Sequence, residues 1–244
     1  MVHTDDTGTL PFATLNGVSR LSALEAVRAR IALAVDLGLL APGERLPGTA
    51  QIAGGLDVGE ITVRRALVSL CADGVLERRR GRSGGTHVAE NPTHGAVVAA
   101  EAYRSDSPAV HRLIDHRLAL ECGIAHLASG HASPDDLSEL QDLVEEMDQV
   151  PSWVEFHGCD ERFHLGLARA TGVPSLTDPY GAVLRELYRY YLPYPMEALR
   201  ESNKEHRRLI DALRRKDAAE AGEVARRHVV VLHNSMFMGL MNTD

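Results

Sequence analysis

Apolar side chains recur at helical spacing over most of the chain, whereas the alternation typical of strands is nearly absent. Within the first 90 residues the clearest such stretch is 61–76, which predicts an amphipathic helix. The residues assigned to its buried face are Ile61, Val63, Ala66, Leu67, Leu70 and Cys71. Asp73 and Gly74 are expected to close the helix, because glycine commonly stands just past a helix end.

A basic, glycine-rich segment follows this helix. Residues 75–80 and 86–88 are expected to pair as two short strands around the glycines of 81–85, which permit positive φ and a close approach to a nucleic-acid backbone. A turn at 42–47 and a short helix come before the amphipathic helix. This order of turn, helix, turn, helix and hairpin predicts a helix-turn-helix with a wing.

Beyond a cluster of helix-breaking residues at 91–95, nearly every segment has a helical pattern. Ser133 and Pro134 form a strong helix start, followed by two acidic residues at the positive end of the helix dipole. Helices are expected over 108–129, 133–149, 152–170, 175–191, 195–215 and 217–238.

These patterns predict a mainly α protein of two domains. The expected fold is an N-terminal winged helix-turn-helix, with three helices and a two-stranded β wing, followed by an all-α antiparallel bundle of about six helices. The expected division is a disordered tail (1–18), a DNA-binding domain (19–90), a linker (91–106) and a helical ligand-sensing and dimerisation domain (107–240). No run of 18 apolar residues and no signal-peptide pattern is present, so no membrane association and a cytoplasmic location are expected.

The net charge of −8 seems at first to disfavour DNA as a partner. Residues 1–90 carry ten basic and ten acidic side chains, so the whole excess of acid lies in 91–244. Within 60–82 there are six arginines and three acids. Local potential rather than total charge steers association with DNA, so a basic face on the first domain remains compatible with DNA binding.

Candidate DNA contacts come from the amphipathic helix and from the wing. They are Thr62, Arg64, Arg65, Arg78, Arg82 and Gly84. Hydroxyl and guanidinium groups suit contacts to phosphates or to guanine edges in the major groove. The alternative is that the arginines form a solvated surface, but the helix-turn-helix pattern around them favours DNA.

The stretch 19–90 resembles the winged-helix domain of the GntR family of bacterial transcription regulators. The resemblance rests on the run 38–47, on the Val-Arg-Arg-Ala-Leu core at 63–67 and on the glycine-rich wing. Family members usually carry Glu-Arg early in the second helix and Ser-Arg at the start of the third, where this chain has Thr49-Ala50 and Gly59-Glu60. The resemblance therefore implies the DNA-binding module rather than the family's usual operator.

A second candidate site lies in the helical domain. Asp160 and His164 are four residues apart, so a helix places them on one face, and the next two helices carry His206 and His228. Three imidazoles and a carboxylate suit zinc, nickel, manganese or cobalt. Among 12 histidines an Asp-x-x-x-His pair also arises by chance, so the residues alone leave open that each histidine is an ordinary core or surface residue.

These four residues match the pattern of the metal-binding version of the FadR-type sensing domain, which the stretch 107–237 resembles. The resemblance implies a divalent transition metal, zinc first, held by Asp160, His164, His206 and His228, and a small carboxylate effector bound beside it. Arg117 matches the family's arginine on the first sensing helix, although it could instead pair with Glu121 at i+4. Asn203, one turn before His206, is a candidate effector contact.

Two classes of function compete. The first is a dimeric, effector-controlled transcription regulator, expected to be a repressor, that binds a palindromic double-stranded operator; a variant has the metal itself as the signal. The second is a metal-dependent hydrolase, since three histidines and a carboxylate also activate water. A hydrolase needs a general base, and no His-Glu-x-x-His motif is present. The winged helix would have no role in an enzyme, so the regulator is favoured.

Overall fold

The computed structural model describes residues 18, 21–82, 84–95 and 97–241. Apart from Val18, the tail expected at 1–18 lies outside the described residues. Val18 itself is buried, and its backbone N–H donates a hydrogen bond of 2.7 Å to the carboxylate of Asp106.

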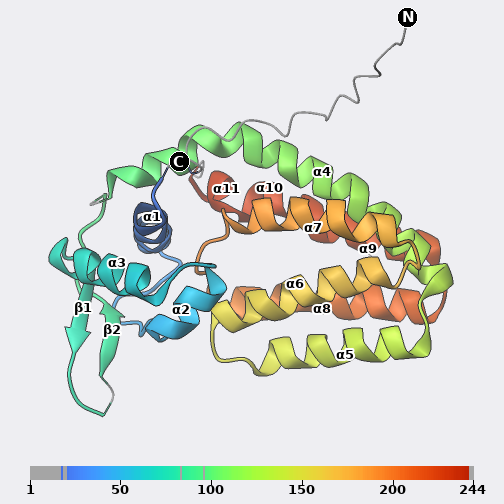
Figure 1. Cartoon of the computed structure of the whole chain (residues 1–244), viewed down its shortest axis with the longest axis horizontal. Coiled ribbons are helices and arrows are strands. Elements are labelled where there is room, and N and C mark those ends of the chain that lie inside the picture. Colours follow the sequence, from blue (N-terminus) through green and yellow to red (C-terminus); the bar gives the residue numbers. More distant parts are fainter. Residues whose placement is uncertain (1–17, 19–20, 83, 96, 242–244) are drawn as a thin grey trace, which may run out of the picture.

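The first domain is a winged helix, as predicted (Figure 1). Its elements are α1 (Ala23–Asp36), α2 (Thr49–Gly55), α3 (Glu60–Ala72), β1 (Leu76–Arg79) and β2 (Gly85–Val88). The two strands pair antiparallel, with Leu76 opposite Val88 and Arg79 opposite Gly85. Figure 1 shows this hairpin extending away from the helices, so its tip is free to meet a partner.

The burial predicted for α3 is wrong at Ile61, which lies in the first turn and is 73% exposed. Val63, Ala66, Leu67 and Leu70 are buried as expected, and Cys71 is partly buried. Gly74, with φ of 77°, follows the end of the helix as predicted.

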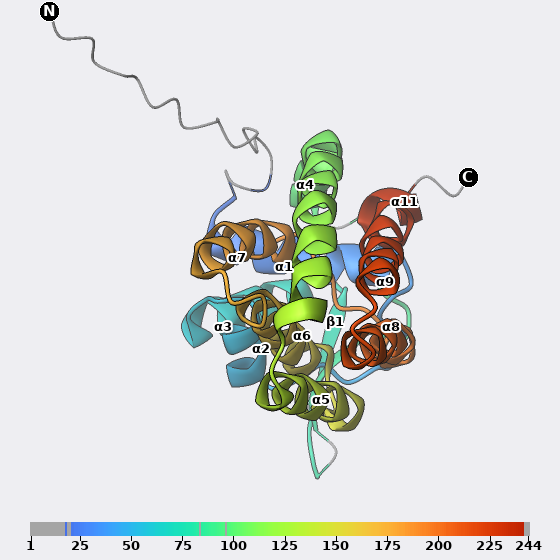
Figure 2. The ribbon, with the colours of Figure 1, turned by 90° about the vertical axis from the view of Figure 1, so that its right-hand side faces the viewer.

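The second domain consists of helices in the part of the chain described. They are α4 (Glu101–His131), α5 (Pro134–Gln149), α6 (Trp153–Arg169), α7 (Pro174–Tyr188), α8 (Met196–Arg214), α9 (Ala218–Val230), α10 (Leu232–Ser235) and α11 (Phe237–Met241), preceded by the short 3₁₀ helix η2 (Val98–Ala100). Figure 2 shows α7 on one side of α4 and α8 and α9 on the other, with α6 below α4 and α5 at the far edge. The predicted start of α5 is confirmed, since Ser133 and Asp136 form a reciprocal capping box.

Helix α4 begins about two turns earlier than the predicted start at residue 108. Pro108, where the predicted helix begins, lies inside α4, where it cannot donate a backbone hydrogen bond. The early turns are held by tertiary contacts: Tyr103 is buried, and Asp106 accepts a hydrogen bond of 2.8 Å from the hydroxyl of Tyr190. The last residues of the expected linker are therefore helical.

The single helix predicted over 217–238 is divided into α9, α10 and α11. Met236 is extended, with φ of −75° and ψ of 170°, so the chain turns back toward the core. Phe237 then lies edge-on to Tyr103, with ring centroids 5.4 Å apart.

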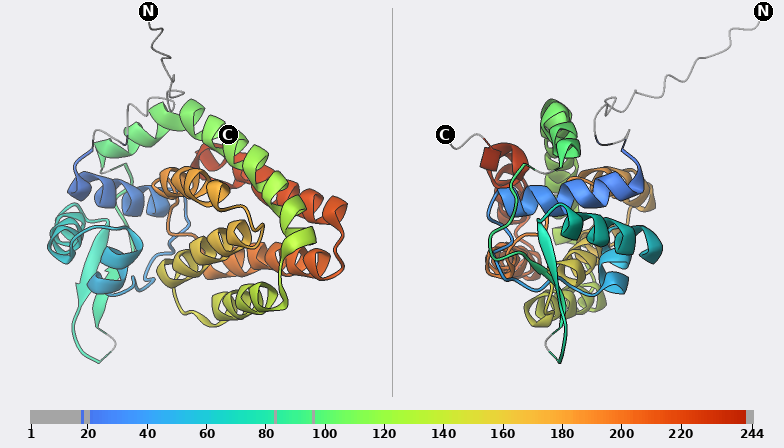
Figure 3. Two further views of the ribbon diagram at one scale, coloured as in Figure 1. Left: turned by 45° about the vertical axis from the view of Figure 1, so that its right-hand side comes forward. Right: turned by 90° about the vertical axis from the view of Figure 1, so that its left-hand side faces the viewer.

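The winged helix packs directly on the helical domain (Figure 3). Gly55 of α2 leaves no room for a side chain because Val154 of α6 lies against it, and the Gln51 amide donates to Glu155 at 2.9 Å. Arg30 of α1 is buried and donates to the backbone carbonyls of Tyr188 (2.5 Å) and Tyr191 (2.6 and 2.8 Å). No helix among the residues described is long and apolar enough to cross a membrane.

Candidate metal centre and DNA-binding surface

The four residues predicted to hold a metal are brought together. Asp160 and His164 lie one turn apart on α6, His206 on α8 and His228 on α9, and all four are buried. Each imidazole offers a nitrogen within 4.8 Å of the others. Oδ1 of Asp160 lies 3.7 Å from Nε2 of His164 and 3.6 Å from Nε2 of His206. Three helices thus supply one cluster.

Three buried ring nitrogens of this cluster form no hydrogen bond with any residue described. They are Nδ1 of His164, which lies 3.4 Å from Oε1 of Glu121, Nε2 of His206 and Nδ1 of His228. Buried polar atoms without a partner are costly, and they commonly mark an ion or ligand that is part of the functional state. Nδ1 of His206 donates to Oδ1 of Asn203 at 3.1 Å, which leaves Nε2 as a lone-pair donor. The residues present therefore fit a metal ion.

Burial keeps the imidazoles neutral. It is the main cause that lowers the pKa of His206 to about 3, and the charge of Arg117 lowers it further. Burial likewise holds the pKa values of His164 and His228 well below their ordinary value. Burial raises the pKa of Asp160, although Arg117 and the Tyr188 hydroxyl lower it in turn. Neutral imidazoles keep the lone pairs that metal binding requires.

Arg117 forms the ion pair with Glu121 that the sequence offered as the alternative to an effector contact. Its Nε donates to Glu121 at 2.7 Å, so the i+4 ion pair is present and fully buried. Its terminal nitrogens donate to the Tyr191 hydroxyl at 3.0 Å and to Nε2 of His164 at 2.8 Å. The guanidinium therefore reaches the histidine cluster, and Tyr191 separates it from the nearby cavity described below.

Asn203 has partners that its predicted effector role did not include. Its amide nitrogen donates to the carbonyl of Val144 and to the carboxylate of Asp148, both at 2.9 Å, while its oxygen accepts from His206. No amide hydrogen is left for an effector, and Asn203 does not line the cavity. Its position instead suits the orientation of His206.

Sequence reasoning missed most of the tyrosines around the cluster. The Tyr188 hydroxyl donates to Asp160 at 2.7 Å, and the Tyr180 hydroxyl donates to Glu121 at 2.6 Å. The density of tyrosines over 188–194 was the available signal, but nothing in the sequence says that they face α4 and α6.

A cavity of about 590 Å³ borders the cluster. Asp160 and His228 form part of its wall, together with side chains from α6, α8, the α7–α8 connection and the C-terminal helices. Its volume lies in the range of about 300–1,000 Å³ that is usual for small-molecule sites. A ligand in this cavity would lie directly beside the histidine cluster.

The predicted DNA contacts lie on one helix face and on the wing. Arg64 and Arg65 of α3 and Arg82 of the wing are exposed and form no ion pair with any residue that the structure describes. Thr62 is half-buried, and exposed Arg78 contacts the Cys71 thiol. Arg79, which was not a predicted contact, is paired with Glu77 and Glu90.

Ile61 and Val68 share the exposed face of α3 with Arg64 and Arg65, at helical spacing. In a major groove, guanidinium groups suit guanine edges and phosphates, and apolar side chains suit the thymine methyl group. Gly84 has a structural reason to be glycine, because a Cβ there would lie 2.7 Å from the carbonyl oxygen of Gly81.

Comparison with known proteins identifies both domains. The model for bacterial regulatory proteins of the gntR family matches residues 23–88, and the FCD domain model matches 112–230. RmpR of Mycobacterium gastri, named as an HTH-type transcriptional regulator, is 31% identical over 210 residues, which cover 84% of this chain and 77% of RmpR. The chain belongs to the GntR family.

Other GntR relatives agree with this assignment. An Escherichia coli protein named as an L-lactate dehydrogenase operon regulatory protein is 28% identical over 85% of this chain and 83% of its own length. A solved GntR family member from Pseudomonas syringae pv. tomato has a TM-score of 0.47 and 19% identity over 91% of this chain and 100% of that chain, a likeness too low to carry weight. The protein is thus a DNA-binding transcription regulator with an FCD domain, as predicted, and not an enzyme.

Proposed function

We propose that this GntR regulator is a homodimeric repressor whose affinity for a palindromic operator is controlled by a small organic acid bound at a metal centre. The observation that carries the proposal is the buried cluster of Asp160, His164, His206 and His228 beside a ligand-sized cavity. One recognition helix contacts few base pairs, and a dimer on two-fold half-sites supplies the rest.

The metal would be a divalent transition ion, with zinc favoured by the histidine-rich ligand set. When bound, it would offer a carboxylate open coordination positions on the side of Asp160 and His228, the two cluster residues that line the cavity. Asn203 would orient His206 by accepting a hydrogen bond from its Nδ1, and Arg117 holds a positive charge next to His164. Short hydroxy acids form one class of effector to test, because a relative is named for a lactate dehydrogenase operon.

A network of contacts supports communication between this centre and the DNA-binding domain. Arg30 of α1 donates to the carbonyls of Tyr188 and Tyr191, the Tyr191 hydroxyl accepts from Arg117, and Arg117 donates to His164. A ligand can alter DNA binding only if it binds the two domain arrangements with unequal affinity. Movement of the 188–194 segment on ligand binding would reach α1 directly.

The test measures DNA binding by fluorescence anisotropy, using DNA from the protein's own promoter region with and without an organic acid. We expect the acid to weaken DNA binding by the zinc-loaded wild type and to have no effect on His206→Ala. His126→Ala, which removes an exposed histidine of α4, serves as the matched control and should respond like the wild type.

A response of His206→Ala equal to that of the wild type would show that the metal is structural and that effector sensing occurs elsewhere. If DNA affinity changes when zinc alone is added, without an organic acid, the metal itself is favoured as the signal. Light scattering should give a dimer, and a monomer that binds DNA tightly would contradict the proposed assembly.

A further inference from the structure

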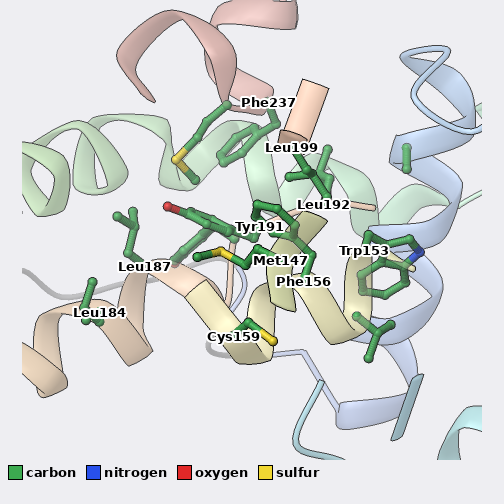
Figure 4. Close-up of a cluster of buried hydrophobic side chains, with 14 of the residues drawn as sticks. Met147, Trp153, Phe156, Cys159, Leu184, Leu187, Tyr191, Leu192, Leu199 and Phe237 are labelled. Atoms are coloured by element: carbon green, nitrogen blue, oxygen red, sulfur yellow. The ribbon is translucent and has the colours of Figure 1, made fainter. Parts of the chain in front are cut away.

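The cavity beside the metal centre has a largely apolar wall. Side chains that form this wall include Phe156, Tyr191, Leu199, Val231, Leu232 and Met236. Figure 4 labels Phe156, Tyr191 and Leu199 within one cluster of buried hydrophobic side chains. An apolar ligand binds most favourably against such a wall, because removal of apolar surface from water contributes to the free energy of binding.

The cavity borders both the histidine cluster and the DNA-binding domain. Asp160 and His228 of the cluster line it, and so does Leu39 from the loop after α1. His157 and Tyr194 are further residues of the lining that carry polar groups.

Two polar atoms in the wall lack partners. Nε2 of His157 and the hydroxyl of Tyr194 are buried and form no hydrogen bond with any residue that the structure describes. Both rings lie near Tyr191, with centroids 5.3 and 6.5 Å from it. Buried polar groups are normally hydrogen-bonded, so this pair suits a polar atom of a ligand.

We propose that the effector is an aryl or similarly bulky monocarboxylic acid with a hydrogen-bonding group at the end distant from its carboxylate. This inference rests on the proposed function, and it adds the chemical class of the effector. The carboxylate would lie at the metal centre, the ring would pack on Phe156, Tyr191 and Leu199, and the distal polar group would reach Tyr194 or His157. A three-carbon hydroxy acid fills little of a cavity of about 590 Å³ and leaves most of its apolar wall without contact.

The experiment is calorimetric titration of the zinc-loaded full chain with four acids: para-hydroxyphenylacetate, phenylacetate, lactate and acetate. We expect both aryl acids to bind on the order of tenfold or more tightly than lactate and acetate, because the ring buries apolar surface. We expect the distal hydroxyl to add about fivefold. Tyr194→Phe should abolish this fivefold preference while phenylacetate binds as before.

A second pair of variants tests the location. Ala198 is an exposed residue of α8 in the cavity wall, so Ala198→Phe should obstruct the cavity while leaving the fold and the zinc content intact. Ala219 is exposed on α9 and does not line the cavity, so Ala219→Phe is the matched control. Ala198→Phe should lose at least tenfold in affinity for para-hydroxyphenylacetate, and the control should lose nothing.

Failure of this inference is distinguishable from failure of the proposed function. Lactate binding as tightly as the aryl acids, or no binding of either aryl acid, overturns the inference. Neither result would contradict the proposed function, in which a short acid controls DNA binding through the site that contains His206. A third result is possible, in which Ala198→Phe abolishes aryl-acid binding and His206→Ala leaves it unchanged. This result supports the cavity as the effector site and contradicts a role of the metal in effector binding.

Discussion

Arg30 offers the most direct test of how the two domains are joined. It is a buried guanidinium without an acidic partner among the residues described, and it donates to the carbonyls of Tyr188 and Tyr191. Tyr188 is the last residue of α7, so the charge lies at the negative end of a helix dipole. Burial lowers the pKa of Arg30, but the ordinary value is so high that the group stays charged.

The substitution Arg30→Met removes the charge and keeps much of the length of the side chain. Two buried carbonyls then lose a charged donor, at a cost of about 1–3 kcal/mol for each unsatisfied group. We therefore expect a loss of about 2–6 kcal/mol from the free energy of unfolding. For a protein of this size, this corresponds to a fall of roughly 4–24 °C in the melting temperature.

The measurement is urea unfolding followed by circular dichroism, together with calorimetric melting. Arg112→Met is the control, because Arg112 is exposed on α4 and surface substitutions usually change stability by less than about 0.5 kcal/mol. The reasoning would be refuted if Arg30→Met cost no more than this control, because the contacts between α1 and the end of α7 would then contribute nothing in solution.

Three further predictions follow from the sites. Arg64→Ala should weaken operator binding by about 1–3 kcal/mol and relax specificity at one base position. Arg82→Ala should instead weaken binding to all DNA sequences equally and lower the slope of log affinity against log salt concentration by about one. Gel shifts over a salt series check both. Asn203→Ala should lower zinc affinity about 10–100-fold in a chelator competition, and unchanged affinity would remove its role in orienting His206. Burial lowers the pKa of His157 to about 3, so below about pH 6.5 protonation favours the unfolded state and the free energy of unfolding falls. Between pH 7.5 and 5, urea unfolding should therefore show the wild type losing about 2 kcal/mol more than His157→Phe. Parallel pH profiles would contradict the third of these.

Local signals predicted most of the fold because they act within a few residues. The capping box at Ser133 and the glycine after α3 each determine their own helix end, and the structure has both where the sequence placed them. The misplaced elements depend on distant contacts. Pro108 lies within a helix because Tyr103 and Asp106 are held by other segments, and the last helix breaks because Phe237 packs on Tyr103.

The candidate metal ligands were predictable from two signals. The spacing of Asp160 and His164 puts them on one face of a helix, and the family pattern selects His206 and His228 among the other histidines. Their surroundings were not predictable in the same way. Which hydrogen-bond partners Asn203 takes, and whether Arg117 faces a pocket or another side chain, depends on how four helices pack. The exposure of Ile61 shows the same limit, because helical spacing alone does not say where the buried face ends.

The size of the effector's influence on DNA binding can be bounded from the cavity. Of the described residues that line it, Leu39 alone belongs to the winged-helix domain. Full burial of one leucine side chain is worth about 1.5–3 kcal/mol, and every 1.4 kcal/mol corresponds to a factor of ten in affinity. If a ligand acts on the DNA-binding domain through Leu39, the change in operator affinity should therefore lie between about tenfold and a hundredfold. A much larger change would require the Arg30 contacts to break as well, so a response that survives Leu39→Ala and disappears in Arg30→Met would place the coupling in the 188–194 segment.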